Sequence, residues 1–253
     1  MELQGKTVLL VGASGGIGVE AARKLLAGGA NVALHYRSKA DSLKQFEDEF
    51  GPDRVVLVQG DVTRVDDVKK IVAATVEKFG TLDAFITTVG TALRIRPFLD
   101  TPEDAVDTTI DIELRSVINC VRAVLPEFVK NRNGRIVIVG SDSGKVGTTG
   151  ESVSAACRGA VIAFSKSIAR EYARYNVLSN VVCPGPTDTG LWDDLVRNDE
   201  FGDKIGNAMI RAIPLRRLGE PAEIAAAAVF LVSGEASYIT GQALSVSGGL
   251  TMS

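Results

Sequence analysis

The stretch "TVLLVGASGGIG" (residues 7–18) decides the fold of this chain. A short aliphatic run leads directly into a turn in which Gly12, Gly16 and Gly18 are spaced as G-x-x-x-G-x-G. Glycines at such a turn let the backbone bend sharply and approach a pyrophosphate, whose charge the N-terminus of the following helix stabilises. The stretch therefore predicts a strand, a nucleotide-binding turn and a helix. A turn that serves only the packing of the helix on the sheet is the alternative.

Short apolar runs like the first one recur along the whole chain. They are apolar on both faces rather than alternating, which is typical of a parallel sheet covered by helices on each side. The segments between them, such as "VDDVKKIVAATVEKFG" (65–80), repeat apolar residues at helical spacing and end on glycine. We therefore predict a single α/β domain over residues 1–253, a Rossmann-type doubly wound fold with a seven-stranded parallel sheet. The seven predicted strands lie at residues 7–12, 31–36, 54–61, 82–89, 134–141, 180–185 and 243–249.

One long connection departs from this alternation. Residues 186–220 are rich in Asp, Arg, Gly and Pro and separate the sixth strand from the last helix. Long connections inside a compact domain usually form lids or binding loops. We predict a lid or substrate loop there.

Bulk properties exclude several classes of protein. The net charge of −3 offers no basic surface for nucleic acid or an anionic membrane, and no apolar stretch reaches the length of about 18 residues that a membrane helix needs. Three unclustered cysteines in apolar sequence, Cys120, Cys157 and Cys183, are typical of buried thiols in a reducing compartment, so we expect a cytoplasmic protein. His35 is the sole histidine, which argues against a zinc site and against a Ser/His/Asp triad. A small-molecule substrate is expected, and no metal.

The end of the second predicted strand bears on the choice of cofactor. It reads "HYRS" (35–38), where an NAD-preferring site places an acidic residue against the ribose 2′-hydroxyl. Arg37 is instead suited to pair with a 2′-phosphate, although a surface arginine after a strand is also common. NADP(H) is therefore favoured over NAD(H). Asp61, at the end of the third strand, is expected to accept a hydrogen bond from the adenine amino group.

Taken together, these motifs resemble the single-domain short-chain dehydrogenases/reductases, and the resemblance covers essentially the whole chain. "NVVCPGPTDTG" (180–190) is similar to the family segment in which a Pro-Gly pair and a threonine flank the nicotinamide. "SYITGQALSVSGG" (237–249) is similar to the last strand and the subunit-contact region of the family's tetramers. The resemblance implies a homotetramer, or a heterotetramer with an intact relative. It implies cofactor contacts from Gly12, Ser14, Gly16, Ile17, Gly18, Arg37, Ser38, Asp61, Val62, Gly90, Arg158, Pro184, Gly185 and Thr187.

The family's four catalytic positions are only partly matched. The serine that bonds the substrate oxygen corresponds to Ser141 in "IVGSDSG". The tyrosine that serves as general acid or base aligns with Ser154, and the lysine four residues later aligns with Arg158. The asparagine of the preceding helix aligns with Glu113, and the family's "NNAG" reads "TTVG" at 87–90. The resemblance thus implies a catalytic set of Ser141, Ser154, Arg158 and Glu113 in which three members are altered.

These alterations remove the usual proton donor. A serine hydroxyl is far less acidic than a phenol with its pKa near 10. Arg158 lies one helical turn from Ser154 and is suited to contact the nicotinamide ribose, but a guanidinium does not exchange protons. No tyrosine occurs between Tyr36 and Tyr172, so none on this segment has taken over the role.

Three hypotheses follow. In the first, the protein reduces a conjugated carbonyl or acyl thioester, Ser141 and Arg158 hold the enolate, and solvent or a carboxylic acid protonates its carbon. The candidate acids are Asp142, Glu151 and Glu113. The alternative for each is that its carboxylate is solvated or paired with a cation, for which Arg115, Lys145 and Arg158 are available. In the second, the chain is a non-catalytic subunit that assembles with an intact relative. A cyclase, isomerase or lyase without net redox change is the third and least favoured.

Overall fold

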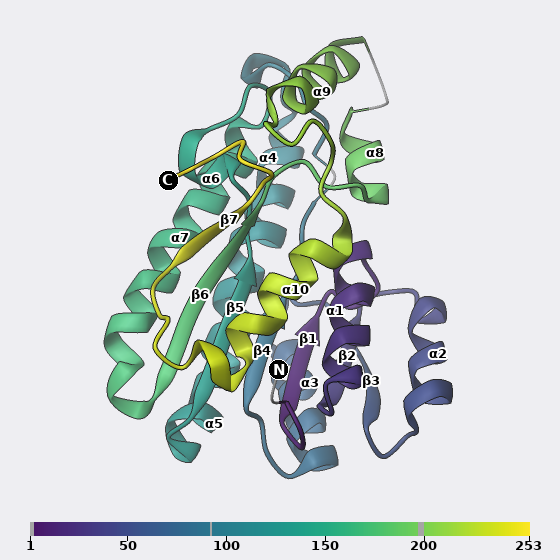
Figure 1. Cartoon of the computed structure of the whole chain (residues 1–253), viewed down its shortest axis with the longest axis vertical. Coiled ribbons are helices and arrows are strands. Elements are labelled where there is room, and N and C mark those ends of the chain that lie inside the picture. The colour runs from purple at the N-terminus through teal and green to yellow at the C-terminus, as the bar shows by residue number, and fades with distance from the viewer. Residues whose placement is uncertain (1–2, 92, 197–199) are drawn as a thin grey trace.

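A seven-stranded sheet forms the centre of the protein (Figure 1). The structure is a computed structural model and describes residues 3–91, 93–196 and 200–253. All neighbouring strands pair in parallel, in the order β3-β2-β1-β4-β5-β6-β7. The predicted fold is therefore confirmed. The strands are β1 (Thr7–Val11), β2 (Asn31–Tyr36), β3 (Val55–Gln59), β4 (Ala84–Thr87), β5 (Gly134–Val139), β6 (Val177–Pro184) and β7 (Ala243–Val246).

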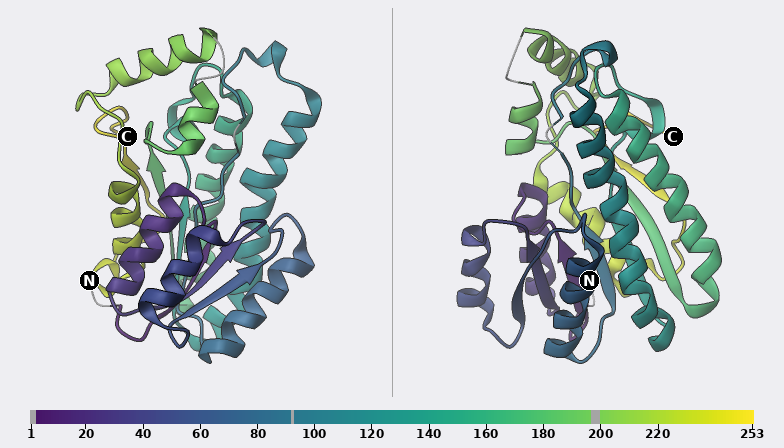
Figure 2. Two further views of the ribbon diagram at one scale, coloured as in Figure 1. Left: turned by 90° about the vertical axis from the view of Figure 1, so that its right-hand side faces the viewer. Right: turned by 180° about the vertical axis from the view of Figure 1, so that it is seen from behind.

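Helices cover both faces of the sheet, as the two views of Figure 2 show. The α-helices are α1 (Gly16–Ala27), α2 (Asp41–Phe50), α3 (Val65–Phe79), α4 (Glu103–Ile110), α5 (Ser116–Asn131), α6 (Ser143–Val146), α7 (Ser152–Tyr172), α8 (Gly190–Val196), α9 (Glu200–Ala212) and α10 (Pro221–Val232). Short helical turns are η1 (Phe98–Asp100), η2 (Asp111–Arg115), η3 (Ala173–Tyr175) and η4 (Gly234–Ala236). No helix among the described residues is both long and apolar enough to span a membrane.

The core consists of two apolar layers, one on each face of the sheet. Successive strand residues point to opposite faces, so Leu10 packs with α1 and α10 while its neighbour Leu9 packs with α3, α5 and α7. Because both layers are apolar, the strands carry no polar face, which is why their sequences do not alternate.

The strand order changes direction between β1 and β4. β1 lies between β2 on one side and β4 on the other, so the connections after β1 and β4 diverge at the carboxyl end of the sheet. In open α/β sheets this point leaves a crevice in which ligands bind. The crevice is the first place to look for a site.

The predicted lid has more regular structure than its composition indicated. Within residues 186–220 the chain forms α8 and α9, at the top of the view in Figure 1, whereas residues 197–199 lie outside the described residues. Trp192 and Val196 are buried together with Ile95 in a small apolar cluster separate from the main core. The apolar residues of these helices are interleaved with the Gly, Asp and Arg that dominate the composition, so the composition alone does not indicate the helices. A role as lid or substrate loop stays a prediction.

Candidate active site

The glycine turn after β1 is shaped by close contacts of its own backbone. Gly12 has φ +81°, and a Cβ there would lie 2.9 Å from Thr88 Oγ1. A Cβ on Gly18 would lie 2.3 Å from the Gly12 carbonyl oxygen. Gly12 and Gly18 are thus required by the turn itself, whatever binds there.

The N-terminus of α1 fits an anionic group. Its N-cap residue is Gly15, which has no side chain to bond the first amides, and the first turn holds no acidic residue. Ser14 and Gly16 are exposed. Unpartnered amides at a helix N-terminus favour phosphate, so this end of α1 matches the pyrophosphate that the sequence predicted.

His35 connects the glycine turn to the end of β3. Its Nδ1 accepts the Gly12 N–H at 3.2 Å, which places the ring hydrogen on Nε2, 3.0 Å from the Gly60 carbonyl oxygen. Burial lowers the pKa of His35, although the Gly60 carbonyl and nearby Asp61 oppose this effect. These hydrogen bonds of His35 were not predicted from the sequence, because a histidine within a strand does not indicate which groups it bonds.

Asp61 is held in a fixed orientation after β3. Its Oδ1 accepts the Thr63 N–H at 2.9 Å and the Thr63 hydroxyl at 2.7 Å. Burial raises the pKa of Asp61, but the Thr63 hydrogen bonds and the positive charges of Arg37 and Arg64 outweigh it, so that the pKa is lowered. Val62 is buried, whereas Arg37 and Ser38 at the end of β2 are exposed. The carboxylate and Arg37 thus face the same region of the surface.

A cavity opens at the carboxyl ends of β1, β4, β5 and β6, below the lid helices. Nine of the predicted site residues line it, and Asp142, Glu151, Leu191 and Trp192 line it as well. The predicted cofactor contacts at the ends of β2 and β3 do not line this cavity; they are Arg37, Ser38, Asp61 and Val62. The glycine turn after β1 lies between these residues and the cavity. The nine are Ile17, Gly90, Glu113, Ser141, Ser154, Arg158, Pro184, Gly185 and Thr187.

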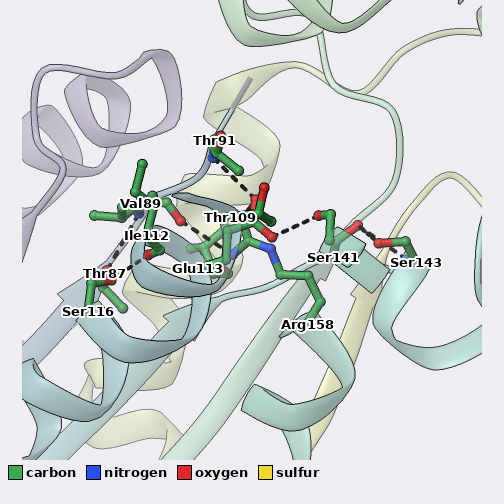
Figure 3. A network of polar contacts seen from close by, with 12 residues as sticks. Thr87, Val89, Thr91, Thr109, Ile112, Glu113, Ser116, Ser141, Ser143 and Arg158 are labelled. Atoms are coloured by element: carbon green, nitrogen blue, oxygen red, sulfur yellow. Dashed lines mark hydrogen bonds and ion pairs between the residues drawn. The ribbon is translucent and has the colours of Figure 1, made fainter. Parts of the chain in front are cut away.

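A buried ion pair forms the floor of the cavity (Figure 3). Arg158 Nη2 lies 3.0 Å from Glu113 Oε1, and the two side chains are 8% and 2% exposed. Arg158 Nη1 donates to the carbonyl oxygens of Val89 and Val139 at 3.3 and 3.2 Å. The guanidinium is thereby fixed beside Gly90, where a Cβ would lie 3.0 Å from Nη2.

The helix that carries Glu113 is distorted where Glu113 bonds Arg158. Between α4 and α5, residues Asp111–Arg115 form a single π-helical turn. Such turns widen a helix locally and are frequent at functional sites. Glu113 Oε1 also accepts the Thr91 N–H at 3.2 Å, and Oε2 accepts the Ser154 hydroxyl at 2.8 Å. Glu113 is therefore bonded to both Ser154 and Arg158.

Ser141 and Ser154 present different hydrogen-bonding groups to the cavity. The Oγ of Ser141 accepts both the N–H and the hydroxyl of Ser143, at 3.2 and 2.9 Å. Its own hydrogen has no acceptor among the described residues, so it is available to a substrate oxygen. The hydrogen of Ser154 is already donated to Glu113, which leaves only lone pairs toward the cavity.

The three other residue groups weighed from the sequence are also located. Cys120, Cys157 and Cys183 are buried free thiols, and burial raises the pKa of Cys120 to about 12 and that of Cys183 to about 11. Their predicted burial is confirmed. No group of three or more potential metal ligands is found among the described residues. Trp192 packs with Ile95 and Val196, and Leu191 approaches Gly90 at the cavity wall.

Comparison with known proteins places this geometry in a family. Residues 12–251 match a family model described as enoyl-(acyl carrier protein) reductase. The chain is 37% identical to the oxidoreductase UcpA of Salmonella typhimurium, over 99% of this chain and 96% of the relative. It is 34% identical to the 3-oxoacyl-[acyl-carrier-protein] reductase FabG of Staphylococcus aureus, over 98% of both chains.

Solved structures agree. Levodione reductase superimposes with a TM-score of 0.90 at 29% identity, over 98% of both chains. A short-chain dehydrogenase/reductase from Brucella melitensis superimposes with a TM-score of 0.84 at 30% identity, over 100% of this chain and 99% of the other. The chain therefore belongs to the short-chain dehydrogenase/reductase family of oxidoreductases.

Proposed function

We propose that the protein is an NADP(H)-dependent reductase of a conjugated carbonyl or acyl thioester, with an active site that lacks the family's tyrosine. One observation carries the proposal. The cavity extends from Ile17 at the start of α1 to Ser141, whose hydroxyl hydrogen is free to bond a substrate oxygen. A reduced nicotinamide bound in this cavity supplies a hydride. The family model and the FabG relative, both described by acyl thioester chemistry, support the substrate class.

The mutual bonding of the altered positions supports an active site that has been rebuilt. A buried charge without a partner costs several kcal/mol, so a buried arginine at this position needs a nearby carboxylate. Here Glu113 accepts from Arg158, Ser154 and Thr91 at once. We infer that the glutamate, the arginine and the serine act as one unit that replaces the family's asparagine, lysine and tyrosine.

Within this unit, Arg158 is held in place and still has donors to offer. Its Nη1 donates to two carbonyl oxygens and Nη2 bonds Glu113, which leaves the second hydrogen of Nη2, beside Gly90, for the enolate or the nicotinamide ribose. We infer that Arg158 and Ser141 together stabilise the enolate oxygen.

The preference for NADP(H) rests on Arg37. No acidic residue follows β2, and Arg37 is exposed beside the fixed Asp61 carboxylate. The test measures the binding of NADPH and of NADH to the wild type and to Arg37→Asp by fluorescence titration. We expect tighter binding of NADPH and a reversed or abolished preference in the variant. Equal and very weak binding of both cofactors to the wild type would contradict the assignment.

The catalytic part of the proposal is tested at Ser141. Wild type is assayed for NADPH oxidation with a panel of enones and 2-enoyl thioesters, and Ser141→Ala is compared at the same cofactor saturation. Loss of one oxyanion donor is expected to reduce kcat about 100-fold or more. Unchanged turnover in Ser141→Ala would show that Ser141 does not hold the enolate.

A non-catalytic subunit is the second candidate, and two observations favour it. The buried Glu113–Arg158 pair occupies the positions of the family's proton-transfer residues. In addition, β7 is an edge strand, and Tyr238, Leu244 and Met252 near it are exposed apolar side chains suited to a subunit contact. Co-expression with an intact family member tests this candidate by mass measurement. A defined mixed tetramer supports it, whereas the homotetramer alone counts against it.

A further inference from the structure

The cavity contains three carboxyl groups, and their surroundings differ. Glu113, Asp142 and Glu151 all line it. In the absence of the family's phenol, the reaction proposed above needs a group that gives up a proton inside this cavity. Two carboxyl groups in different environments commonly divide into one that stays ionised and one that stays protonated. The hydrogen bonds of each group show which is which.

Glu113 is engaged with protein donors. It pairs with Arg158 at 3.0 Å and accepts the Ser154 hydroxyl and the Thr91 amide. Its side chain is 2% exposed, and both carboxyl oxygens are directed to these partners, so Glu113 is poorly placed to give a proton to a substrate.

Asp142 belongs to a second network that leads away from the cavity. Its Oδ1 accepts the Ser245 hydroxyl at 2.8 Å, and Ser245 Oγ in turn accepts Lys145 Nζ at 2.8 Å. Lys145 also contacts the carbonyl of Ser253 at the C-terminus. Asp142 therefore connects the end of β5 with β7 and the C-terminal residues through Oδ1, whereas its Oδ2 is buried without a hydrogen-bond partner among the described residues. Because Oδ1 is fixed in this network, which Lys145 closes, we favour the third carboxyl group as the proton donor.

Glu151 forms no ion pair with any residue that the structure describes. It is the N-cap residue of α7, one turn before Ser154 and therefore on the same side of the helix. Its side chain bonds Thr148 and is only partly exposed. Two of the charged groups around it, Glu113 on the π-helical turn and Arg158 on α7, neutralise each other. The other two are Asp142, which lines the same cavity, and Arg96, whose backbone amide bonds the Gly150 carbonyl.

Burial and the nearby Glu113 carboxylate raise the pKa of Glu151 to about 7, although Arg158 and Thr148 oppose the rise. A large share of the Glu151 side chains therefore carries a proton at neutral pH, next to the space that a tyrosine side chain at position 154 would fill. An acid whose pKa lies near the working pH is the most efficient proton donor.

We propose that Glu151 is the catalytic acid of this site and replaces the family's tyrosine in that role. The proposal rests on the proposed function and specifies its proton. Bound NADPH would supply a hydride to the β-carbon of a conjugated acyl thioester and be oxidised to NADP⁺. The C=C electron pair then forms a double bond between the α-carbon and the carbonyl carbon, and the C=O pair moves to the oxygen, which Ser141 holds. The resulting enolate takes the Glu151 proton on its α-carbon, as the O–H bond of Glu151 breaks. Solvent then protonates the carboxylate through the open side of the cavity.

The first experiment reads the proton without any ligand. Protein labelled with ¹³C at the glutamate carboxyl carbons is titrated by NMR between pH 4 and pH 9. We expect one glutamate that titrates near pH 7 in the wild type and disappears in Glu151→Gln. The matched control is Glu171→Gln, which removes an exposed glutamate at the far end of the same helix and is expected to keep the titration near pH 7.

The second experiment measures reduction of a 2-enoyl thioester by the same proteins. Wild-type turnover is expected to fall as the pH rises through 7, because the protonated form is the active one. Glu151→Gln is expected to lose about 100-fold or more in kcat and the pH dependence, while its KM for NADPH is unchanged. Glu151→Asp, which keeps a carboxyl group, is expected to recover part of the rate, and Glu171→Gln all of it.

The outcomes separate the two proposals. If Glu151→Gln keeps the wild-type turnover and the wild-type pH profile, Glu151 is not the proton donor, and the proposed function is unaffected. A glutamate titration confined to pH 4–5 would also overturn it. Absence of wild-type turnover with every conjugated substrate, together with an intact titration near pH 7, would overturn the proposed function and with it the donor role.

Discussion

Replacing Arg158 by methionine is expected to destabilise the protein by about 3–5 kcal/mol, because it leaves the Glu113 carboxylate buried without its cation. The magnitude follows from the burial of the pair, since Glu113 is 2% exposed and retains only the hydrogen bonds from Thr91 and Ser154. Replacing Glu113 by glutamine at the same time removes the unpaired charge; the amide oxygen accepts the Thr91 N–H, and the amide NH2 donates to the Ser154 hydroxyl. The double variant is therefore expected to be more stable than Arg158→Met alone.

The assay is urea unfolding at pH 7 of the wild type, both single variants and the double variant. We expect a coupling free energy of about 1–3 kcal/mol between the two positions. The matched control is the cycle Arg115→Met and Asp111→Asn, an exposed ion pair between the two ends of the π-helical turn that carries Glu113, with an N–O distance of 2.6 Å, where at most about 0.5 kcal/mol is expected. Additive effects at Glu113 and Arg158 would refute the idea that they form one unit.

Two further predictions concern stability and rest on the same structure. The pKa of Glu151 rises from 4.5 in the unfolded chain to about 7 in the folded protein. Between pH 4.5 and pH 7 the folded protein therefore binds a proton that the unfolded chain has lost. As the pH rises through this range, the free energy of unfolding falls by about 3 kcal/mol. Glu151→Gln is therefore expected to unfold at a higher temperature than the wild type at pH 8.5, by about 6–12 °C, and not at pH 4; the same melting temperature as the wild type at pH 8.5 would contradict this. Gly18→Ala forces a Cβ to 2.3 Å from the Gly12 carbonyl and is expected to cost about 2 kcal/mol or more, whereas Gly190→Ala, with no atom within 4 Å, is expected to cost almost nothing in the same urea unfolding assay.

Most of the fold follows from local sequence. Runs such as "TVLLVG" and "GRIVIV" are apolar on both faces, and this property reflects the two helical layers that bury them. The ends of the elements are less predictable. β6 begins at Val177, three residues before the predicted start, because hydrogen bonding to β5 continues through Leu178 and Ser179. Pairing with a neighbouring strand is not encoded in the segment itself.

The lid shows where composition misleads. Glycine, aspartate and arginine dominate residues 186–220, yet Trp192, Val196 and Ile205 recur at spacings that place them on one side of the helices. Their partner is Ile95, about a hundred residues earlier in the chain. A helix that is stabilised by so distant a contact gives only a weak pattern of its own.

The site was partly predictable. The turn, Ser141, Ser154 and Arg158 follow from motifs with fixed spacing, and the structure gathers the last three around one cavity. Glu113 was also expected at the site from the resemblance, but its bonds to Arg158, Ser154 and Thr91 and the π-helical turn that carries it did not follow from the sequence. The environment of Glu151 did not follow either, since it depends on a carboxylate from another helix.

The most direct test of the account follows the hydride. Wild-type protein is incubated with NADPH carrying deuterium at both C4 positions and with a 2-enoyl thioester, and the product is analysed by mass spectrometry and NMR. We predict one deuterium at the β-carbon and a solvent proton at the α-carbon, with formation of the labelled product strongly slowed in Ser141→Ala. Tight binding of NADPH without deuterium in the product of any conjugated substrate would contradict the central claim that this cavity performs a reduction.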